Sequence, residues 1–288
     1  MKHLLLWGFV PAMLATAQPA QAQLAAAPNR ALIFSNDSVA SGGGNITYQW
    51  YRNGEPISGA TGANYTLPAE LANGTEMIEI VRGAKSSNCD DVHFSNPFLV
   101  TFCVTIGGVC WANTNIDKFR IFAERPDMYT RFYQWNRAKA WSTTGAYVDE
   151  WDSNPDKSTW TVNPCPAGWR LPTSENFQTL HNAGTTWAAA NTRGNEVNGR
   201  FYGPNHADSI NCRLPNNMTN CVFLPTGGNR LYNNSWLDSN NQVTLGAYWT
   251  STTYSGGITH GYYWFFNSTL SNLDANNKAS GYTVRCVQ

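Results

Sequence analysis

Apolar and polar positions alternate in the first structured part of the chain, which begins near residue 45. In ITYQWYRNG, Ile46, Tyr48 and Trp50 alternate with Thr47, Gln49 and Tyr51, which is the period of a half-buried strand. The turn pair Asn53-Gly54 follows. Further strands are expected in residues 63–67, 77–83 and 97–104. Short strands separated by turn residues predict an all-β, immunoglobulin-like sandwich over residues 45–104.

The pattern differs in residues 105–288. Thr173 is a good N-cap and Glu175 suits a first turn, while Phe177, Leu180 and His181 form an apolar stripe that Gly184 can end. A helix is therefore expected after Pro172. Residues 185–220 are dominated by turn formers, and four strands are expected in CVFLPTGG, GAYWTSTTY, GYYWFFNST and GYTVRCVQ. One early helix, an irregular region and a run of strands predict an α+β domain.

The N-terminus has the pattern of an export signal. Lys2 and His3 precede an apolar run from Leu4 to Leu14, and Ala20-Gln21-Ala22 offers a cleavage site before Gln23. The run is too short to span a bilayer. We expect residues 1–22 to be a signal peptide and residues 23–44, rich in Ala, Ser and Gly, to be a linker.

Charge narrows the range of partners. The chain of 288 residues has 19 basic and 19 acidic side chains, and 13% of its residues are charged. Nucleic acids and anionic membranes both require a basic face. The composition therefore argues against either partner, and no membrane span is expected.

Seven cysteines follow the leader, and in an exported chain they indicate disulfides. Cys165 precedes the helix and Cys286 lies in the last strand, so we expect them to be linked. Cys212 and Cys221 are expected to form a local bridge. Cys89, Cys103 and Cys110 are left: one should be unpaired, and Cys89 with Cys103 is one available link. The absence of any C-x-x-C pair and the scattered histidines argue against zinc.

Four motifs in order, NPCPAGWRLPT with a following F-x-x-L, FLPTGG, AYWTST and a terminal GYTVRCV, resemble the Fibrobacter succinogenes major paralogous domain. The resemblance covers residues 105–288. It implies export from a Gram-negative bacterium such as a member of the Bacteroidetes. It also implies a C-type lectin-like fold whose long loop region carries the ligand surface.

Residues 27–104, with YQWYRNG and a Tyr-Thr-Leu strand, resemble the immunoglobulin-like modules of exported bacterial surface proteins. No cysteine sits on the first sheet, which departs from antibody domains. Such modules usually serve as spacers, so this part is expected to hold the C-terminal domain away from its attachment point.

Loops 229–242, 253–264 and 266–277 combine aromatic residues with Asn, Asp and Ser. Carbohydrate sites use aromatic faces against sugar rings and polar side chains for the hydroxyls. The candidate ligand-binding residues are Trp236, Asp238, Asn240, Tyr254, His260 and Tyr262. The alternative is that these loops are simply good turn formers and that the aromatic residues fill the core.

Calcium is the one candidate ion, and no motif supports it. C-type lectins carry Glu-Pro-Asn or Gln-Pro-Asp and Trp-Asn-Asp triplets, whereas this chain has Gly203-Pro204-Asn205 and Trp264-Phe265-Phe266-Asn267. Asp238 and Asp274 are the carboxylates that would serve as ligands if calcium were bound. We therefore expect no cofactor and no metal site.

No HExxH, GxSxG or phosphate-binding loop is present, so no catalytic residue is assigned. The sequence favours an exported, non-catalytic protein, extracellular or at the cell surface with the periplasm as an alternative, that binds a glycan or a surface protein. One alternative is a fimbria-associated or structural adhesin that binds protein. Another, less favoured, is an enzyme similar to formylglycine-generating enzymes, which need a reactive cysteine pair that the expected disulfides do not leave.

Overall fold

A computed structural model describes most of the chain. The described residues are 23–26, 33–34, 45–66, 78–88, 90–95, 98–214, 217–218, 220–237 and 239–288. The signal peptide expected in residues 1–22, Cys89 and Asp238 lie outside them. Strands make up 40% and helices 7% of the structure. The chain is thus mostly β-sheet with few helices, as in an all-β or α+β fold.

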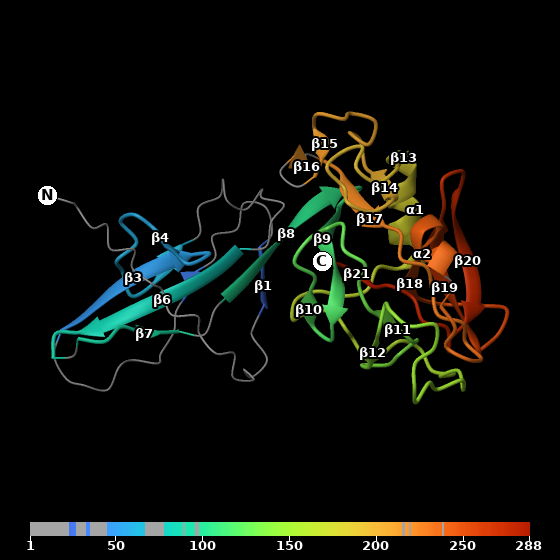
Figure 1. The fold of residues 1–288 in the computed structure, drawn as a ribbon, viewed down its shortest axis with the longest axis horizontal. Helices are drawn as coiled ribbons and strands as arrows, with labels where there is room; N and C mark the ends of the chain where they lie inside the picture. The colour runs from blue at the N-terminus through green and yellow to red at the C-terminus, as the bar shows by residue number, and fades with distance from the viewer. Residues whose placement is uncertain are drawn as a thin grey trace, which may run out of the picture.

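The N-terminal part is built on two long antiparallel strands, β3 (Ile46–Arg52) and β6 (Ile78–Ser86) (Figure 1). Asn53 and Gly54 turn the chain from β3 into β4 (Glu55–Pro56) with φ angles of 48° and 84°. The left-handed region suits both residue types. The Trp50 side chain is fully buried, and its indole Nε1 donates to the Gly62 carbonyl. β7 (His93–Phe94) pairs with β6.

Strand β8 (Phe98–Ile106) crosses the boundary expected between residues 104 and 105. Its start pairs with β6, and its end pairs with β9 (Val109–Lys118). β1 (Gln23–Ala26) pairs parallel to β8, and β2 (Ile33–Phe34) pairs with β5 (Tyr65–Thr66). The segment expected to be a linker therefore contains two short strands. β10 (Ile121–Phe122) and β21 (Arg285–Val287) complete the pairing of β9.

Helix α1 (Ser174–Asn182) confirms the prediction from NPCPAGWRLPTSENFQTL. Thr173 is the N-cap, and its partner in a capping box is Asn176. Phe177 and Leu180 are buried. The chain leaves the helix through Gly184, whose φ of 107° suits glycine.

The remaining elements form small sheets. β13 (Thr185–Ala188), β14 (Gly199–Tyr202) and β17 (Val222–Pro225) make one, and β18 (Gly246–Thr253), β19 (His260–Phe266) and β20 (Ser271–Asn277) make another. Two short hairpins are β11 (Phe132–Tyr133) with β12 (Ala140–Trp141), and β15 (Cys212–Arg213) with β16 (Asn217–Met218). Helix α2 (Ser239–Thr244) precedes β18.

Two expectations from the sequence were wrong here. Residues 271–277, predicted to lie in a loop, form β20, and the region 185–220 contains β13 and β14. β20 is an edge strand made of SNLDANN, and its side chains are half-buried or exposed. Few of its residues are apolar, so the alternation that marks a strand is weak.

Three disulfides link described cysteines. Cys165 to Cys286 and Cys212 to Cys221 confirm the predicted pairs, with Cα–Cα distances of 6.0 Å in each. Cys103 on β8 is bonded to Cys110 on β9, at 5.4 Å between Cα atoms. The link considered between Cys89 and Cys103 was therefore wrong, because the pairing of β8 with β9 brings Cys103 to Cys110 and the two are bonded.

Much of the aromatic content fills the core of the C-terminal part. Trp135, Trp249, Tyr263 and Tyr282 lie in one buried cluster, with Trp249 and Tyr282 ring centroids 4.5 Å apart. Trp111, Phe177, Tyr248 and Trp264 belong to a second cluster beneath α1. Within the described ranges, no helix is long and apolar enough to cross a membrane.

Candidate ligand-binding site at the end of the β18–β20 sheet

The site lies at the start of β19, before Trp264, which contacts α1. Even-numbered residues of β19 share one face, since side chains alternate along a strand. Trp264 is buried on this face and its ring stacks on Phe177 of α1, with centroids 5.6 Å apart and planes 5° from parallel. His260 and Tyr262 come earlier on the same face and are only half-buried.

Three of the candidate residues come together there. Tyr254, at the end of the β18–β19 hairpin, lies edge-on to Tyr262 at 5.3 Å and 84°, and 6.3 Å from the His260 ring. They line a pocket of about 400 Å³, which we call the hairpin pocket. Its other lining residues are Gly256 and residues 273–275 of β20. The pocket therefore has aromatic walls on one side and a strand edge on the other.

Gly256 sets the position of one wall. A Cβ atom added to Gly256 would lie 2.4 Å from the Tyr254 ring, which is closer than any normal contact. The Tyr254 ring therefore rests on the glycine backbone. A Cβ on the next residue, Gly257, would meet nothing within 4 Å. The two glycines consequently offer a matched pair of substitutions.

Polar groups of the hairpin pocket are held by neighbours. The Tyr263 hydroxyl donates to Asp274 Oδ2 at 3.1 Å, and the Ala275 amide donates to Asp274 Oδ1 at 2.8 Å. Burial, and then the nearby Asp274 carboxylate, raise the pKa of Tyr263. His260 Nδ1 lies 3.0 Å from Thr259 Oγ1. A carboxylate has further lone pairs, so Asp274 can accept from a ligand hydroxyl while fixed in place.

The other candidate residues lie elsewhere. Trp236 lines a second pocket beside α2. Asn240 is exposed on α2, and Asp238 is outside the described residues. Gly256, Leu273 and Ala275 line the hairpin pocket and were not predicted from the sequence. The signal for Leu273 was the alternation of Leu273 and Ala275 within a polar stretch.

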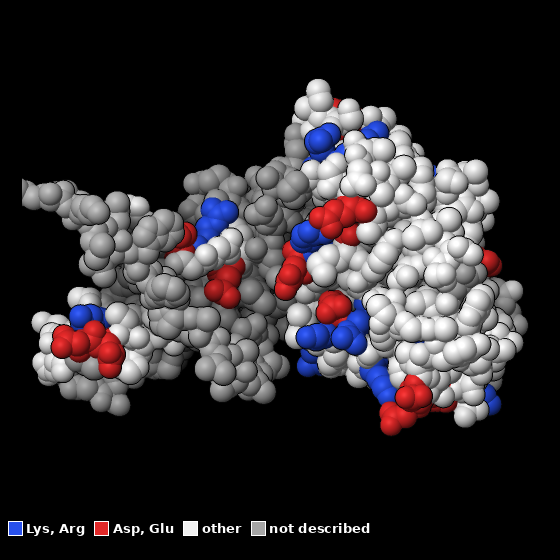
Figure 2. All heavy atoms as spheres, in the orientation of Figure 1, with Lys and Arg blue, Asp and Glu red and all other residues white. Residues whose placement is uncertain are grey.

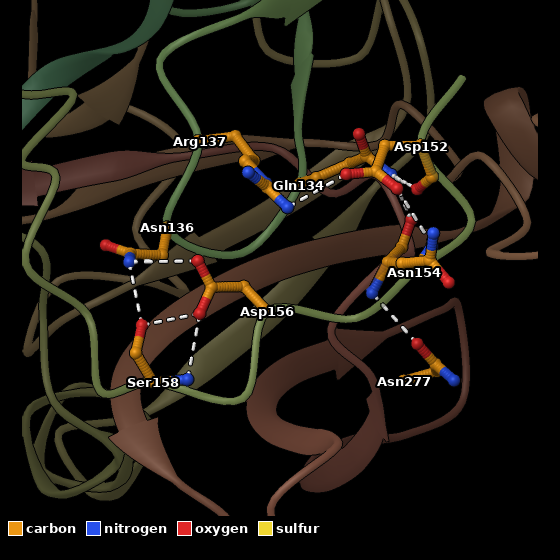
Figure 3. A network of polar contacts seen from close by, with 9 residues as sticks. Gln134, Asn136, Arg137, Asp152, Asn154, Asp156, Ser158 and Asn277 are labelled. Carbon is orange, nitrogen blue, oxygen red and sulfur yellow. Dashed lines mark hydrogen bonds and ion pairs between the residues drawn. The ribbon is translucent and has the colours of Figure 1, made fainter.

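A polar network ties residues 134–158 together (Figure 3). Asp156 accepts from Ser158 and Asn136, and Asp152 accepts from Arg137 at 2.8 Å and from the Asn154 amide. Burial alone would raise the pKa of Asp156, but these hydrogen bonds together lower it. Both carboxylates are therefore used to fold the loop. In the described part of the chain, no group of at least three His, Cys, Asp or Glu side chains is placed to hold a metal ion.

Comparisons of the chain with protein-family models, with curated proteins and with solved structures found no match.

Proposed function

We propose that this chain is an exported, non-catalytic binding protein that recognises a carbohydrate through the hairpin pocket. The observation that carries the proposal is the convergence of Tyr254, His260 and Tyr262 on an open pocket of about 400 Å³. Sugar rings present apolar faces that pack on aromatic rings. Hydroxyl groups need acceptors and donors beside those rings, and Asp274 and His260 are placed for this.

The proposal includes the finer architecture. Residues 105–288 are proposed to be C-type lectin-like and residues 45–104 to be an immunoglobulin-like spacer on the cell surface. The disulfide between Cys165 and Cys286 supports an oxidising compartment. The helix that packs beside β18, β19 and β20 supports the C-terminal assignment, and buried Trp50 on β3 supports the N-terminal one.

A glycan array probed with the oxidised chain from Gln23 onward tests the function. We expect specific binding, and we expect Tyr262→Ala to abolish it. Gly256→Ala should weaken binding several-fold by displacing the Tyr254 ring, whereas Gly257→Ala should bind as the natural chain does. Neither glycine has a positive φ, so both alanines fit the backbone. Equal binding by the two alanine variants would contradict the role of Tyr254.

The array is run with calcium and with a chelator. Loss of binding in the chelator would show that a metal ion takes part. A blank array from protein that unfolds cooperatively would contradict carbohydrate recognition, and the protein-binding adhesin would become the better hypothesis.

A further inference from the structure

The short helix α2 stands between two further pockets. Ser239 and Gln242 line one of them together with Trp236, and Asn241 and Thr244 line the other together with Trp187. At 100° per residue, these two pairs lie on opposite sides of the helix. We call these the Trp236 pocket, of about 340 Å³, and the Trp187 pocket, of about 320 Å³.

The two pockets have the same chemistry. Each has a tryptophan at least partly accessible to solvent, and Trp236 is 36% exposed. The Trp236 pocket adds hydroxyl and amide groups from Thr143, Thr144, Ser239 and Gln242. The Trp187 pocket adds those of Asn241, Thr244, Asn267 and Ser268, with the Phe265 ring.

None of the described residues that line either pocket is charged. Figure 2 shows the same tendency at larger scale, because Lys, Arg, Asp and Glu gather in a few groups on the face shown and leave wide uncharged stretches. The hairpin pocket differs, since it contains His260 and Asp274. The described linings of the α2 pockets therefore suit a neutral ligand that has apolar faces and many hydroxyl groups.

Arg230 holds the loop that lines the Trp236 pocket through hydrogen bonds to its backbone. This buried guanidinium donates to the carbonyl oxygens of Ser142, Thr144, Gly145, Ala146 and Ser235. Gln242 Nε2 also donates to the Thr143 carbonyl at 2.9 Å, which joins α2 to the same loop. A site held in this way loses little conformational freedom when a ligand binds.

The Trp187 pocket has an equivalent support. Buried Arg200 donates to the carbonyl oxygens of Asn267 at 2.8 Å and Ser268 at 3.2 Å. α2 itself sits on Gly228, where a Cβ atom would lie 2.9 Å from the Gln242 amide nitrogen. The FLPTGG motif thus lets the helix approach closely enough to separate the two pockets.

We infer that the Trp236 and Trp187 pockets are two subsites for one neutral oligosaccharide chain that crosses α2. The inference rests on the proposed function for its ligand class and adds that the protein binds an internal stretch of a polysaccharide. A helix with its side chains is about 10 Å wide, which exceeds a single pyranose ring. Only a chain of several sugars can occupy both pockets.

Calorimetric titration of the full oxidised chain with neutral oligosaccharides tests the inference. The probes are β-1,4-linked glucose, mannose and xylose series, each from the monosaccharide to the hexasaccharide. Affinity should rise steeply with length and then level off. Trp236→Ala removes one good aromatic contact, and Ser268→Tyr fills the Trp187 pocket from an exposed turn. Each variant should weaken hexasaccharide binding about tenfold.

Each variant has a control, which is a similar substitution at a nearby exposed position. Tyr232→Ala removes an aromatic side chain that is 42% exposed near Trp236, and Leu270→Tyr adds a ring at a position that is 47% exposed in the turn of Ser268. Neither residue lines a pocket beside α2, so both variants should bind normally.

The outcomes separate the two proposals. Length-dependent binding that both pocket variants weaken, whether or not Tyr262→Ala also weakens it, would support the inference. Binding that is independent of length, or lost only in Tyr262→Ala, would overturn it and leave the hairpin pocket as the site. Failure of the folded protein to bind any sugar, here and on the array, would overturn both.

Discussion

At the scale of single residues, buried arginines in this chain are matched to backbone carbonyls. Arg230 and Arg285 are both fully buried. Arg285 donates to the carbonyls of Ala112 and Phe223, and burial lowers its pKa to about 10. Burial also lowers the pKa of Arg230. The planar fork of arginine can reach several carbonyl oxygens at once, which lysine cannot do.

Arg230→Lys should therefore destabilise the fold although it keeps the charge. The ammonium cannot reach both the 142–146 loop and Ser235, so buried carbonyls lose their donors. We expect a loss of about 3 kcal/mol in the free energy of unfolding, the scale seen when a buried charged partner is removed. Urea unfolding measures the loss, and a shift in tryptophan emission would report the Trp236 loop.

Arg131→Lys is the control for this substitution. The Arg131 side chain is 40% exposed, and its Nε lies 4.0 Å from Asp117. A surface pair of this kind contributes little, so the control should stay close to the natural stability. Equal losses of unfolding free energy in the two variants would show that the hydrogen bonds of Arg230 to the carbonyls do not stabilise the fold.

At the scale of elements, strong periodicity decided what the sequence could predict. α1, β18 and β19 follow from a capped apolar stripe and from dense aromatic strands. β20 was missed because its residues are mostly polar. The grouping of Tyr254, His260 and Tyr262 follows from a hairpin in which side chains alternate between the two faces of each strand. The Trp236 pocket could not be predicted from the sequence. It depends on a hydrogen bond from Arg230 to the Ser142 carbonyl, and these two residues are 88 positions apart.

Two histidines near the end of α1 and near β13 have lowered pKa values, and these predict a fold that is less stable in acid. His181 lies in the last turn of α1, and His206 Nδ1 lies 2.6 Å from Thr186 Oγ1 of β13. Burial lowers the pKa of both, and positive charge on Arg200 and Arg193 lowers them further. Below an unfolded pKa near 6.5, the unfolded chain binds protons that the folded chain excludes.

We therefore expect the free energy of unfolding to decrease as the pH falls from 7 to 5. His206→Gln should reduce this slope, because one of the two groups no longer titrates. Exposed His93→Gln serves as the control and should leave the slope unchanged. Denaturant unfolding at several pH values gives the slope, and a steeper one in the His206 variant would contradict the assignment.

At the scale of the whole molecule, the C-terminal strand closes the C-terminal part onto its own beginning. β21 pairs with β9, and the Gln288 amide donates to the Cys110 carbonyl at 2.9 Å. Arg170, just before α1, bridges to Val287 through two backbone hydrogen bonds. Figure 1 shows the C-terminus beside β9, with β19 and β20 on the far side of this part. The closure and the hairpin pocket, which lies on β19 and β20, are thus at separate places.

The disulfide between Cys165 and Cys286 covalently fixes this closure across a sequence separation of 121 residues. In the chain-entropy account, it stabilises by about 5 kcal/mol, against about 2.5 kcal/mol for Cys103 to Cys110, because loop length sets the entropy removed from the unfolded chain. The latter pair is separated by only 7 residues. Cys165→Ala/Cys286→Ala should therefore lower the unfolding free energy more than Cys103→Ala/Cys110→Ala, in denaturant titrations without reductant. Equal losses would mean that local packing around each bridge, rather than closure of the long loop, holds the C-terminal strand in place.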